Sequence, residues 1–308
     1  MSDLVESLIQ AGAEGPDGPV LERLLLTEWL LGCAGLASPP GPTTAVAADP
    51  AELVVRPNVT GVTVSGVLPA VPWGDRCAHL VVLAGDRVLR FERASLVVRP
   101  GTNLAGEPRD TVRLPEVELP AGAVGPAPPS TPSSAPPSAP SWAPPLAEFR
   151  RRAALGRASL IAGAAGAALA MSVRHAGERA QFGRPIGRFQ AVAQQLAVAA
   201  SEVAGAVASA RAAGQIAQRD GFGSESALVA VAAAKCWASE VAGSVAAIAH
   251  QVHGAVGLST EHPLGRATTR LWAWRDEDGS ETEWGEVLGT MAGEGGPARL
   301  WPLLTGYP

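Results

Sequence analysis

The sequence contains little cysteine and no excess of basic residues. Its 308 residues include only three cysteines, Cys33, Cys77 and Cys236, which lie far apart and form no paired motif. This spacing supports neither a disulfide framework nor a cysteine zinc site. The formal net charge of -5 provides no global positive field, so the composition does not favour nucleic acid as a partner.

The sequence also lacks the usual marks of secretion and membrane insertion. Its first residues, Met1–Ser7, are acidic and lack the basic start of a secretory signal. The most apolar run, Ala158–Val173, is shorter than the roughly 20 residues that span a bilayer. His250 and His253 share a helix face, but no third ligand for a metal is evident. We therefore expect a cytoplasmic protein with no membrane partner and no metal ion.

Composition divides the chain into four segments. Residues 122–145 are dominated by Pro, Ser and Ala, which predicts an extended linker, because such a stretch cannot bury apolar surface. Residues 49–121 alternate and are rich in Val and Thr, which predicts a small antiparallel β domain. Residues 1–48 are expected to form a short N-terminal helical segment, with helix between 20 and 37. The predicted fold class is thus α+β and mainly α, with a C-terminal helical bundle over 146–308.

Local patterns place the individual elements. Strands are expected at 59–67, 79–84, 87–91, 95–99 and 111–114. Ala-rich runs between turn signals predict helices at 148–179, 189–219, 224–253 and 263–274. Small residues on several helix faces let the axes approach closely, as in an up-down bundle of the four-helix type.

A first motif, Arg-x-Gln-Phe-Gly-x-Pro-Ile-x-x-Phe-Gln, begins at Arg179 and ends at Gln190. Arg179 offers a planar fork of donors to a pyrophosphate oxygen. The amides of Gln181 and Gln190 can bond ribose or phosphate groups, and Phe182 offers a flat apolar face to an adenine. The motif therefore contains the groups that a nucleotide site needs.

The same residues also have a purely structural explanation. Arg179 could pair with Glu178 or Asp220, Phe182 could belong to the core, and the glycines could only turn the chain. The sequence alone leaves both explanations open.

A second motif, Gln-x-His-Gly-Ala-x-Gly, runs from Gln251 to Gly257. Gly254 and Gly257 allow backbone amides to approach a phosphate without a Cβ clash. His253 and Ala255 lie in the same expected turn.

The two motifs, in this order and separation, resemble signatures of the C-terminal domain of the acyl-CoA dehydrogenase family, and the resemblance extends from about Glu148 to Leu288. It implies an FAD-dependent flavoprotein oxidoreductase of lipid metabolism and fatty acid β-oxidation that dehydrogenates acyl-CoA thioesters. In family dimers these motifs reach the ADP half of the partner's FAD. The resemblance implies the following cofactor-binding residues: Arg179, Gln181, Phe182, Gln190, Gln251, His253, Gly254, Ala255, Ser280 and Thr282.

The catalytic base of most family members is a Glu directly before Gly-Thr or Gly-Ser, and Asp278 holds that place here. Aspartate is one methylene shorter, and an offset of about 1 Å can cost on the order of 100-fold in rate. Glu277 is the fallback, Glu281 is a third choice, and a solvated acidic loop over 276–286 is the structural alternative. Some relatives place the base on the first helix of this domain, but residues 150–158 contain no acid.

The sequence departs from the family in its N-terminal half. The flavin-ring segment of the type Thr-Glu-Pro-x-x-Gly-Ser-Asp has no match, since Thr43–Pro50 occupies its place with other residues. Most of the N-terminal helical domain is missing as well. Three hypotheses follow. The first is a subunit that lends FAD contacts to a longer acyl-CoA dehydrogenase in a hetero-oligomer. The second is a self-sufficient homo-oligomer using Asp278, and the third is a scaffold that has lost FAD.

Overall fold

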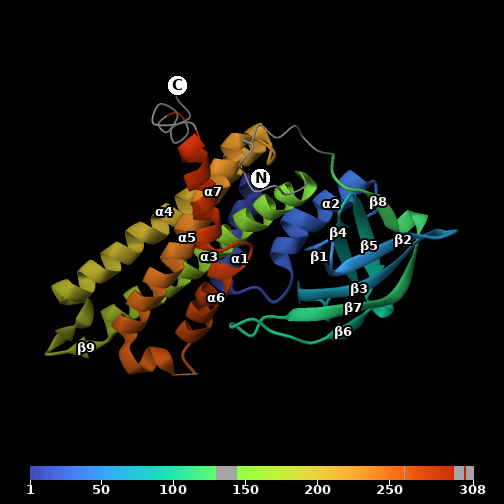
Figure 1. The fold of residues 1–308 in the computed structure, drawn as a ribbon. Helices are drawn as coiled ribbons and strands as arrows, with labels where there is room; N and C mark the ends of the chain where they lie inside the picture. The colour runs from blue at the N-terminus through green and yellow to red at the C-terminus, as the bar shows by residue number, and fades with distance from the viewer. Residues whose placement is uncertain (130–143, 260, 295–301, 303–308) are drawn as a thin grey trace. The chain divides into compact units, whose positions relative to one another are not determined.

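The chain forms two compact units. The structure, a computed structural model, describes residues 1–129, 144–259, 261–294 and 302 (Figure 1). The helical unit contains residues 1–15 and the described residues from 154 onward, and the β unit contains residues 16–129 and 144–153. The described residues hold seven α-helices, two four-stranded sheets and one two-stranded sheet, which confirms the predicted α+β, mainly helical class.

The helical unit comprises α1 (Ser2–Glu14), the part of α3 (Pro144–Glu178) after residue 153, α4 (Gln190–Asp220), α5 (Glu225–His253), α6 (Leu264–Asp276) and α7 (Glu281–Glu294). The four helices predicted after the linker are confirmed as α3 to α6, with ends within a few residues of those expected. Ser224 begins α5 as an N-cap, because its hydroxyl accepts a hydrogen bond from the Ala227 amide at 3.1 Å. Helices α1 and α7 lie in segments expected to be helical, although neither was predicted as an individual helix.

Helix α1 packs against α3 where glycines allow a close approach. A Cβ added at Gly12 would overlap the Leu160 carbonyl, and one added at Gly163 would overlap the Ile9 carbonyl. Val5 of α1 is completely buried and packs against Gly214 of α4. Small residues therefore set the separation of α1 and α3, as expected for tight helix packing.

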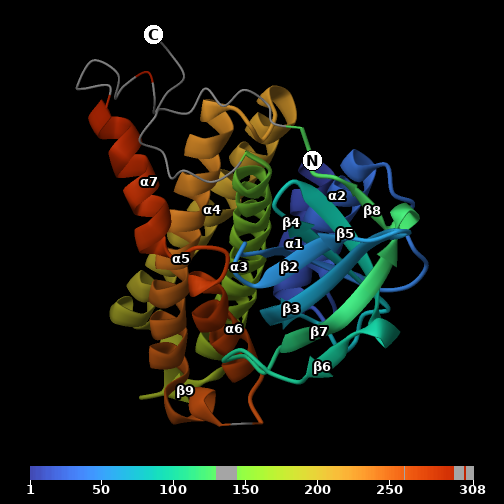
Figure 2. The ribbon, with the colours of Figure 1, turned by 45° about the vertical axis from the view of Figure 1, so that its right-hand side comes forward.

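The β unit consists of two four-stranded sheets (Figure 2). One has the order β1-β4-β5-β8, from β1 (Thr43–Ala48), β4 (His79–Ala84), β5 (Arg87–Glu92) and β8 (Val124–Pro126). The other has the order β2-β3-β7-β6, from β2 (Leu53–Pro57), β3 (Gly61–Pro72), β7 (Arg109–Pro120) and β6 (Val97–Arg99). Alternating Val and Leu side chains and Phe91 form the core. All five predicted strands are found, as β3 to β7.

Two parts of the β unit differ from the expected division of the chain. Residues 43–48 fall in the segment expected to be helical, yet they form β1, because Thr and Val suit a pleated strand. This strand runs parallel to β4, and β2 and β3 supply the crossover that a parallel pair needs. Residues 122–126, expected as linker, belong to a short 3-10 turn (Ala121–Ala123) and to β8, which pairs with β5. The linker residues 130–143 lie outside the described part.

The segment between α1 and β1 is helical where helix was expected, although one turn is wider than an α-helix. A π-helical stretch, Glu22–Thr27, continues directly into α2 (Glu28–Ala34). Gly35 ends α2 in the left-handed conformation at φ 66°. Leu30 and Leu31 of α2 are buried.

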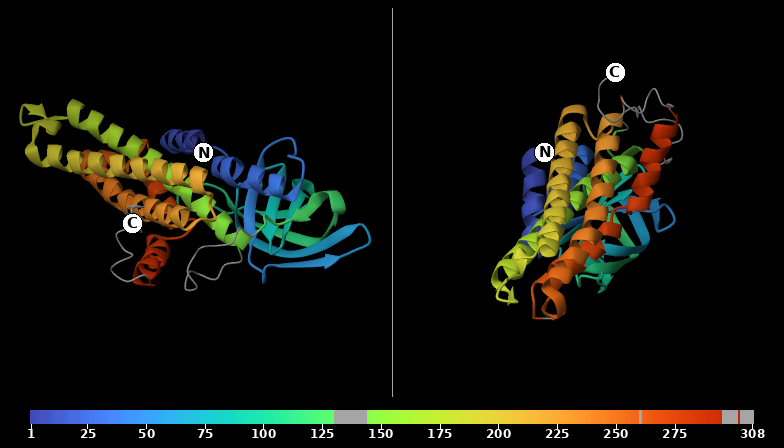
Figure 3. Two further views of the ribbon diagram at one scale, coloured as in Figure 1. Left: turned by 90° about the horizontal axis from the view of Figure 1, so that it is seen from above. Right: turned by 90° about the vertical axis from the view of Figure 1, so that its left-hand side faces the viewer.

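Three helices are long and apolar enough, by length and composition, to cross a membrane: Pro145–Glu178, Gln190–Asp220 and Glu225–Leu258 (Figure 3). The apolar stretch of the first helix is longer than the run recognised in the sequence. Its most apolar window is 72% buried and that of the third helix 56%, so packing within the protein accounts for much of their apolar character. The window in α4 is only 11% buried, and α4 therefore exposes an apolar, Ala-rich face.

The packing of α1 on α3 predicts that Gly163→Ala destabilises the protein by about 1–3 kcal/mol, because the added methyl has no room. Gly177→Ala on the same helix is the matched control, since nothing lies within 4 Å of its Cβ position. We expect this control to leave stability unchanged or raise it slightly. Thermal and urea unfolding measure both. Equal stability of the two variants would contradict the packing.

Candidate functional site

The first motif forms a rigid hairpin at the end of α3. Strands β9 (Ala180–Gln181) and β10 (Arg184–Pro185) pair in antiparallel fashion, with Phe182 and Gly183 at the turn (Figure 1). Both turn residues have positive φ, 50° and 79°, as a two-residue type I′ turn requires. This conformation costs on the order of 1 kcal/mol at a non-glycine residue such as Phe182, so the hairpin holds it in place.

The aromatic residues of the hairpin lie at the surface. Phe182 is 92% exposed and meets Phe189 edge-on, with 6.2 Å between ring centroids. The Arg184 guanidinium lies over the Phe189 ring at 4.3 Å. Phe182 is therefore not a core residue, and its ring is accessible to a flat ligand.

The polar side chains of the first motif are also exposed. Within the described part of the chain, no hydrogen bond or ion pair engages the side chains of Arg179, Gln181 or Gln190. Asp220, the expected structural partner of Arg179, is instead bound by Arg219 at 2.7 Å. The donors of this motif thus face solvent.

The second motif forms the end of α5 and the 3-10 turn that follows it, Gly254–Leu258. His253 points inward and is buried, and its Nδ1 donates to the Ala249 carbonyl at 2.8 Å. Its ring stacks on His175 at 4.5 Å and meets His262 edge-on at 5.0 Å. Burial lowers the pKa of His253, and the neighbouring imidazoles add to this effect.

His253 therefore supports the turn from inside, and the direct cofactor contact that the resemblance implies stays a prediction. Gln251, Gly254 and Ala255 are exposed on the outer side of the turn. Gly257 packs so closely that a Cβ there would lie 2.8 Å from the His253 Cβ. The exposed members of the motif are the ones available to a ligand.

Stacking of His175 on His253 brings the two motifs to one end of the helical unit. His175 precedes Arg179 by one helical turn, and His253 follows Gln251 by two residues. Figures 1 and 2 show the hairpin and the turn after α5 at this end. A groove of about 590 Å³ adjoins the hairpin, lined mainly by small and apolar residues: Val173, Ala176, Gly177, Pro185, Gly187, Arg188, Ala193, Leu196 and Ala197.

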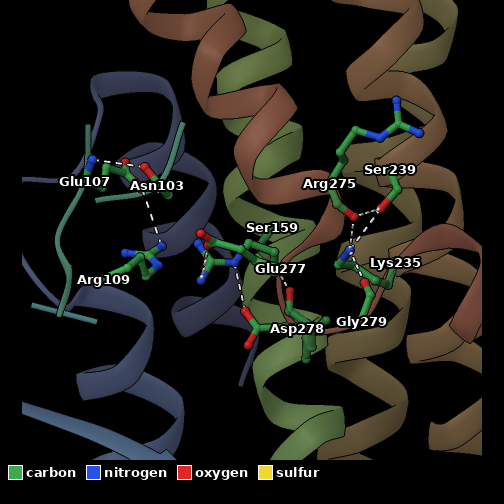
Figure 4. A network of polar contacts seen from close by, with 12 residues as sticks. Asn103, Glu107, Arg109, Ser159, Lys235, Ser239, Arg275, Glu277, Asp278 and Gly279 are labelled. Carbon is green, nitrogen blue, oxygen red and sulfur yellow. Dashed lines mark hydrogen bonds and ion pairs between the residues drawn. The ribbon is translucent and has the colours of Figure 1, made fainter. Parts of the chain in front are cut away.

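The acidic turn after α6 points inward. The Arg157 Nε donates to Asp278 Oδ2 at 2.8 Å, and its Nη2 lies 3.1 Å from the Glu277 carboxylate (Figure 4). Arg157 is only 4% exposed, and Asp278 has the left-handed φ of 58°. Both candidate bases therefore share one buried guanidinium of α3. The alternative of a fully solvated acidic loop does not describe them.

A second buried cation holds the same turn. The Nζ of Lys235, on α5, donates to the Arg275 carbonyl at 2.8 Å, the Gly279 carbonyl at 2.7 Å and Ser239 Oγ at 2.9 Å (Figure 4). Burial lowers the pKa of Lys235 to about 8, although the Asp278 charge opposes the shift. Lys235 thereby fixes the end of α6 and the turn beyond it.

Ser280 serves as the N-cap of α7. Its hydroxyl accepts from the Glu283 amide at 3.2 Å, and the Glu283 carboxylate accepts from the Ser280 amide at 2.7 Å. This reciprocal pair is a capping box. Thr282 lies exposed on the first turn of α7, and the Glu281 carboxylate lies 3.8 Å from Arg275. The caps and pairs here account for the turn without a ligand.

Arg157 and Lys235 were not predicted from the sequence as residues of this site. Both are single charges within otherwise apolar helical runs, and Lys235 is the only lysine in the chain. Lys and Arg are almost never fully buried unless they are paired, so an isolated charge of this kind is a usable signal. Among the described residues, no group of three or more His, Cys, Asp or Glu could hold a metal ion.

The C-terminal half of the chain is similar to acyl-CoA dehydrogenases. The family model described as acyl-CoA dehydrogenase, C-terminal domain, matches residues 149–281. Over 103 residues the chain is 41% identical to acyl-CoA dehydrogenase FadE27 of Mycobacterium tuberculosis, covering 32% of this chain and 27% of that protein. It is 38% identical over 102 residues to acyl-CoA dehydrogenase IpdE2 of Mycolicibacterium smegmatis, covering 33% of this chain and 30% of that protein. The matched part thus spans less than a third of either relative.

Solved structures share the fold over most of the chain. A chain of the ChsE4-ChsE5 complex from Mycobacterium tuberculosis superposes with a TM-score of 0.78 at 22% identity, covering 94% of this chain and 79% of that one. The glutaryl-coenzyme A dehydrogenase glutaryl-CoA complex gives a TM-score of 0.66 at 20% identity, covering 77% of this chain and 60% of that one. At these identities the likeness concerns the fold.

The burial of Lys235 predicts that its amino group titrates at an unusually low pH. Its pKa is about 8 in the folded protein against an ordinary value of 10.5, so below pH 8 both folded and unfolded states are protonated and the burial cost is fully present. Between pH 8 and pH 10.5, the unfolded state binds more protons at Lys235 than the folded state does. The contribution of Lys235 to the free energy of unfolding therefore rises with pH, by on the order of 3 kcal/mol in total.

NMR of protein labelled with ¹³C-lysine measures this pKa directly, since the chain has one lysine. Lys235→Met is the control for the stability measurement and should lack the rise. A titration midpoint near 10.5 would contradict the buried network.

Proposed function

We propose that the chain belongs to the acyl-CoA dehydrogenase family and is a flavoprotein subunit that binds the ADP half of a partner's FAD. The assembly would dehydrogenate an acyl-CoA thioester between the α and β carbons. The observation that carries the proposal is the set of exposed donors on the hairpin and the adjoining turn, which no described residue engages.

The residues at this end of the helical unit fit an adenine nucleotide. Arg179 can offer two parallel N–H donors to a pyrophosphate, and the exposed Phe182 ring can stack on adenine. Gln181, Gln190 and Gln251 can bond ribose hydroxyls or phosphate oxygens. When bound, FAD supplies the acceptor for the hydride that leaves the β carbon. The role of these side chains is to bind and orient the nucleotide.

Two observations support a second subunit. The apolar face of α4 is uncovered, and Val198, Trp237 and Trp272 remain 37–49% exposed on the helical unit. Apolar and aromatic surface of this kind is typical of protein interfaces. One similar solved chain belongs to a complex named for two components, ChsE4 and ChsE5. We therefore propose a longer acyl-CoA dehydrogenase subunit as the partner.

The alternative of a self-sufficient enzyme is supported less well. It requires Asp278 or Glu277 to take the α-proton of the substrate, and both carboxylates face Arg157. A carboxylate would have to give up its ion pair with this buried cation before it could act, which is costly.

Arg179→Ala should weaken FAD binding in the assembly by roughly tenfold to a hundredfold, since it removes charge-assisted hydrogen bonds to phosphate. Arg174→Ala is the matched control, because Arg174 is also exposed on α3 but precedes the motif. The measurement is flavin absorbance and FAD dissociation in the full chain copurified with the longer subunit.

Full flavin retention after Arg179→Ala would refute the nucleotide-binding role. An assembly that contains no flavin with either the original chain or the variants would instead favour a scaffold that has lost FAD.

A further inference from the structure

Arg157 and Lys235 enclose the turn that carries both candidate bases. Arg157 reaches it from α3 and contacts two successive carboxylates, those of Glu277 and Asp278, with different nitrogens of one guanidinium. Lys235 reaches it from α5 through the carbonyl of Gly279. We propose that Arg157 is a positioning residue that holds these carboxylates as ion-pair partners and withholds them from proton transfer, while Lys235 fixes the backbone of the turn.

The main chain of the turn is fixed independently of the carboxylates. The Trp284 indole donates to the Asp278 carbonyl at 3.0 Å, and Lys235 donates to the Gly279 carbonyl at 2.7 Å. A Cβ at Gly279 would collide with the Trp284 indole, so the turn and α7 fit closely. With the backbone held on both sides, the Asp278 side chain cannot be redirected by a simple slip of the loop.

The buried positive charges make the contacts of this turn costly to break. Arg157 is 4% exposed and Lys235 is fully buried, so each depends on the acids and carbonyls of the turn for compensation. The Trp274 ring lies 5.9 Å from the Arg157 guanidinium, an apolar neighbour that offers it no anion. Moving either carboxylate away from Arg157 would break an ion pair with a buried cation, which is costly. The ion pairs therefore stabilise the junction of α3, α5 and α6.

This inference rests on the proposed function, in which chemistry belongs to the partner subunit. It explains why the chain keeps acids at the family's base position without using them as bases. The acids are there as counterions for cations that hold the helices together.

Carboxylate labelling tests the proposal without flavin. The full chain is treated with a carbodiimide and an amine nucleophile, and labelled sites are mapped by mass spectrometry. We expect Asp278 and Glu277 to be protected, and Arg157→Met to raise their labelling roughly tenfold or more. Arg157→Lys keeps the charge and should restore much of the protection. Strong labelling of Asp278 in the unchanged chain would overturn the proposal.

Two internal controls separate a local effect from unfolding. Glu202 lies in the helical unit and accepts a hydrogen bond from Ser244 at 2.7 Å, so its labelling should not change in Arg157→Met, whereas unfolding of that unit would expose it as well. Arg152→Met is the matched variant, because Arg152 pairs with Glu148 at 2.7 Å. It should raise labelling at Glu148 and leave Asp278 protected.

A second experiment measures flavin reduction in the assembly with the longer subunit. Loss of flavin reduction by acyl-CoA in Asp278→Asn, at full FAD content, would also overturn the proposal, because Asp278 would then act as a base. Failure of the proposed function has a different signature, namely unchanged FAD binding in Arg179→Ala.

Discussion

The stacking of His175 on His253 is the contact on which the site depends. It joins the last turn of α3 to the last turn of α5, and each helix continues there into one of the two motifs. The ring of His253 fills the inside of the turn that follows it, while the exposed donors lie outside. Without this contact, two segments more than 60 residues apart in the sequence would have no reason to form one surface.

The polar groups of the helical unit divide into two sets with opposite properties. Those of the hairpin, such as Arg179 and Gln181, are exposed and form no side-chain hydrogen bond or ion pair with any described residue. Those near the acidic turn are already bonded inside the bundle. Arg157 binds the Asp278 carboxylate, and Lys235 binds the Gly279 carbonyl. Binding a ligand that a partner carries requires the first property. Proton transfer from a substrate requires a carboxylate that is free to move, which the second set does not provide.

Much of the fold could be predicted from the sequence, because helix and strand periods and turn residues are local signals. Ser224 marked the start of α5, and the turn at 85–86 marked the strands on either side of it. The parallel pairing of β1 and the packing of α1 on α3 depend on contacts between distant residues, which periodicity does not encode.

The candidate site likewise combines features that a local sequence motif predicts with features that depend on distant residues. The exposed hairpin follows from a motif within 12 residues, whereas the stacking of His253 on His175 and the ion pair of Arg157 with Asp278 join segments far apart. Ser280 shows a related limit: its sequence context suggested a cofactor contact, but its hydroxyl caps a helix that was not predicted.

The central claim is that this chain contacts the nucleotide end of an FAD held by another subunit. An FAD analogue with a photoreactive azide on its adenine tests this most directly in the purified assembly, with cross-linked peptides mapped by mass spectrometry. The account predicts cross-links on this chain within residues 179–190 or 251–257. Cross-links found solely on the longer subunit, or on this chain only near residues 276–282, would contradict it.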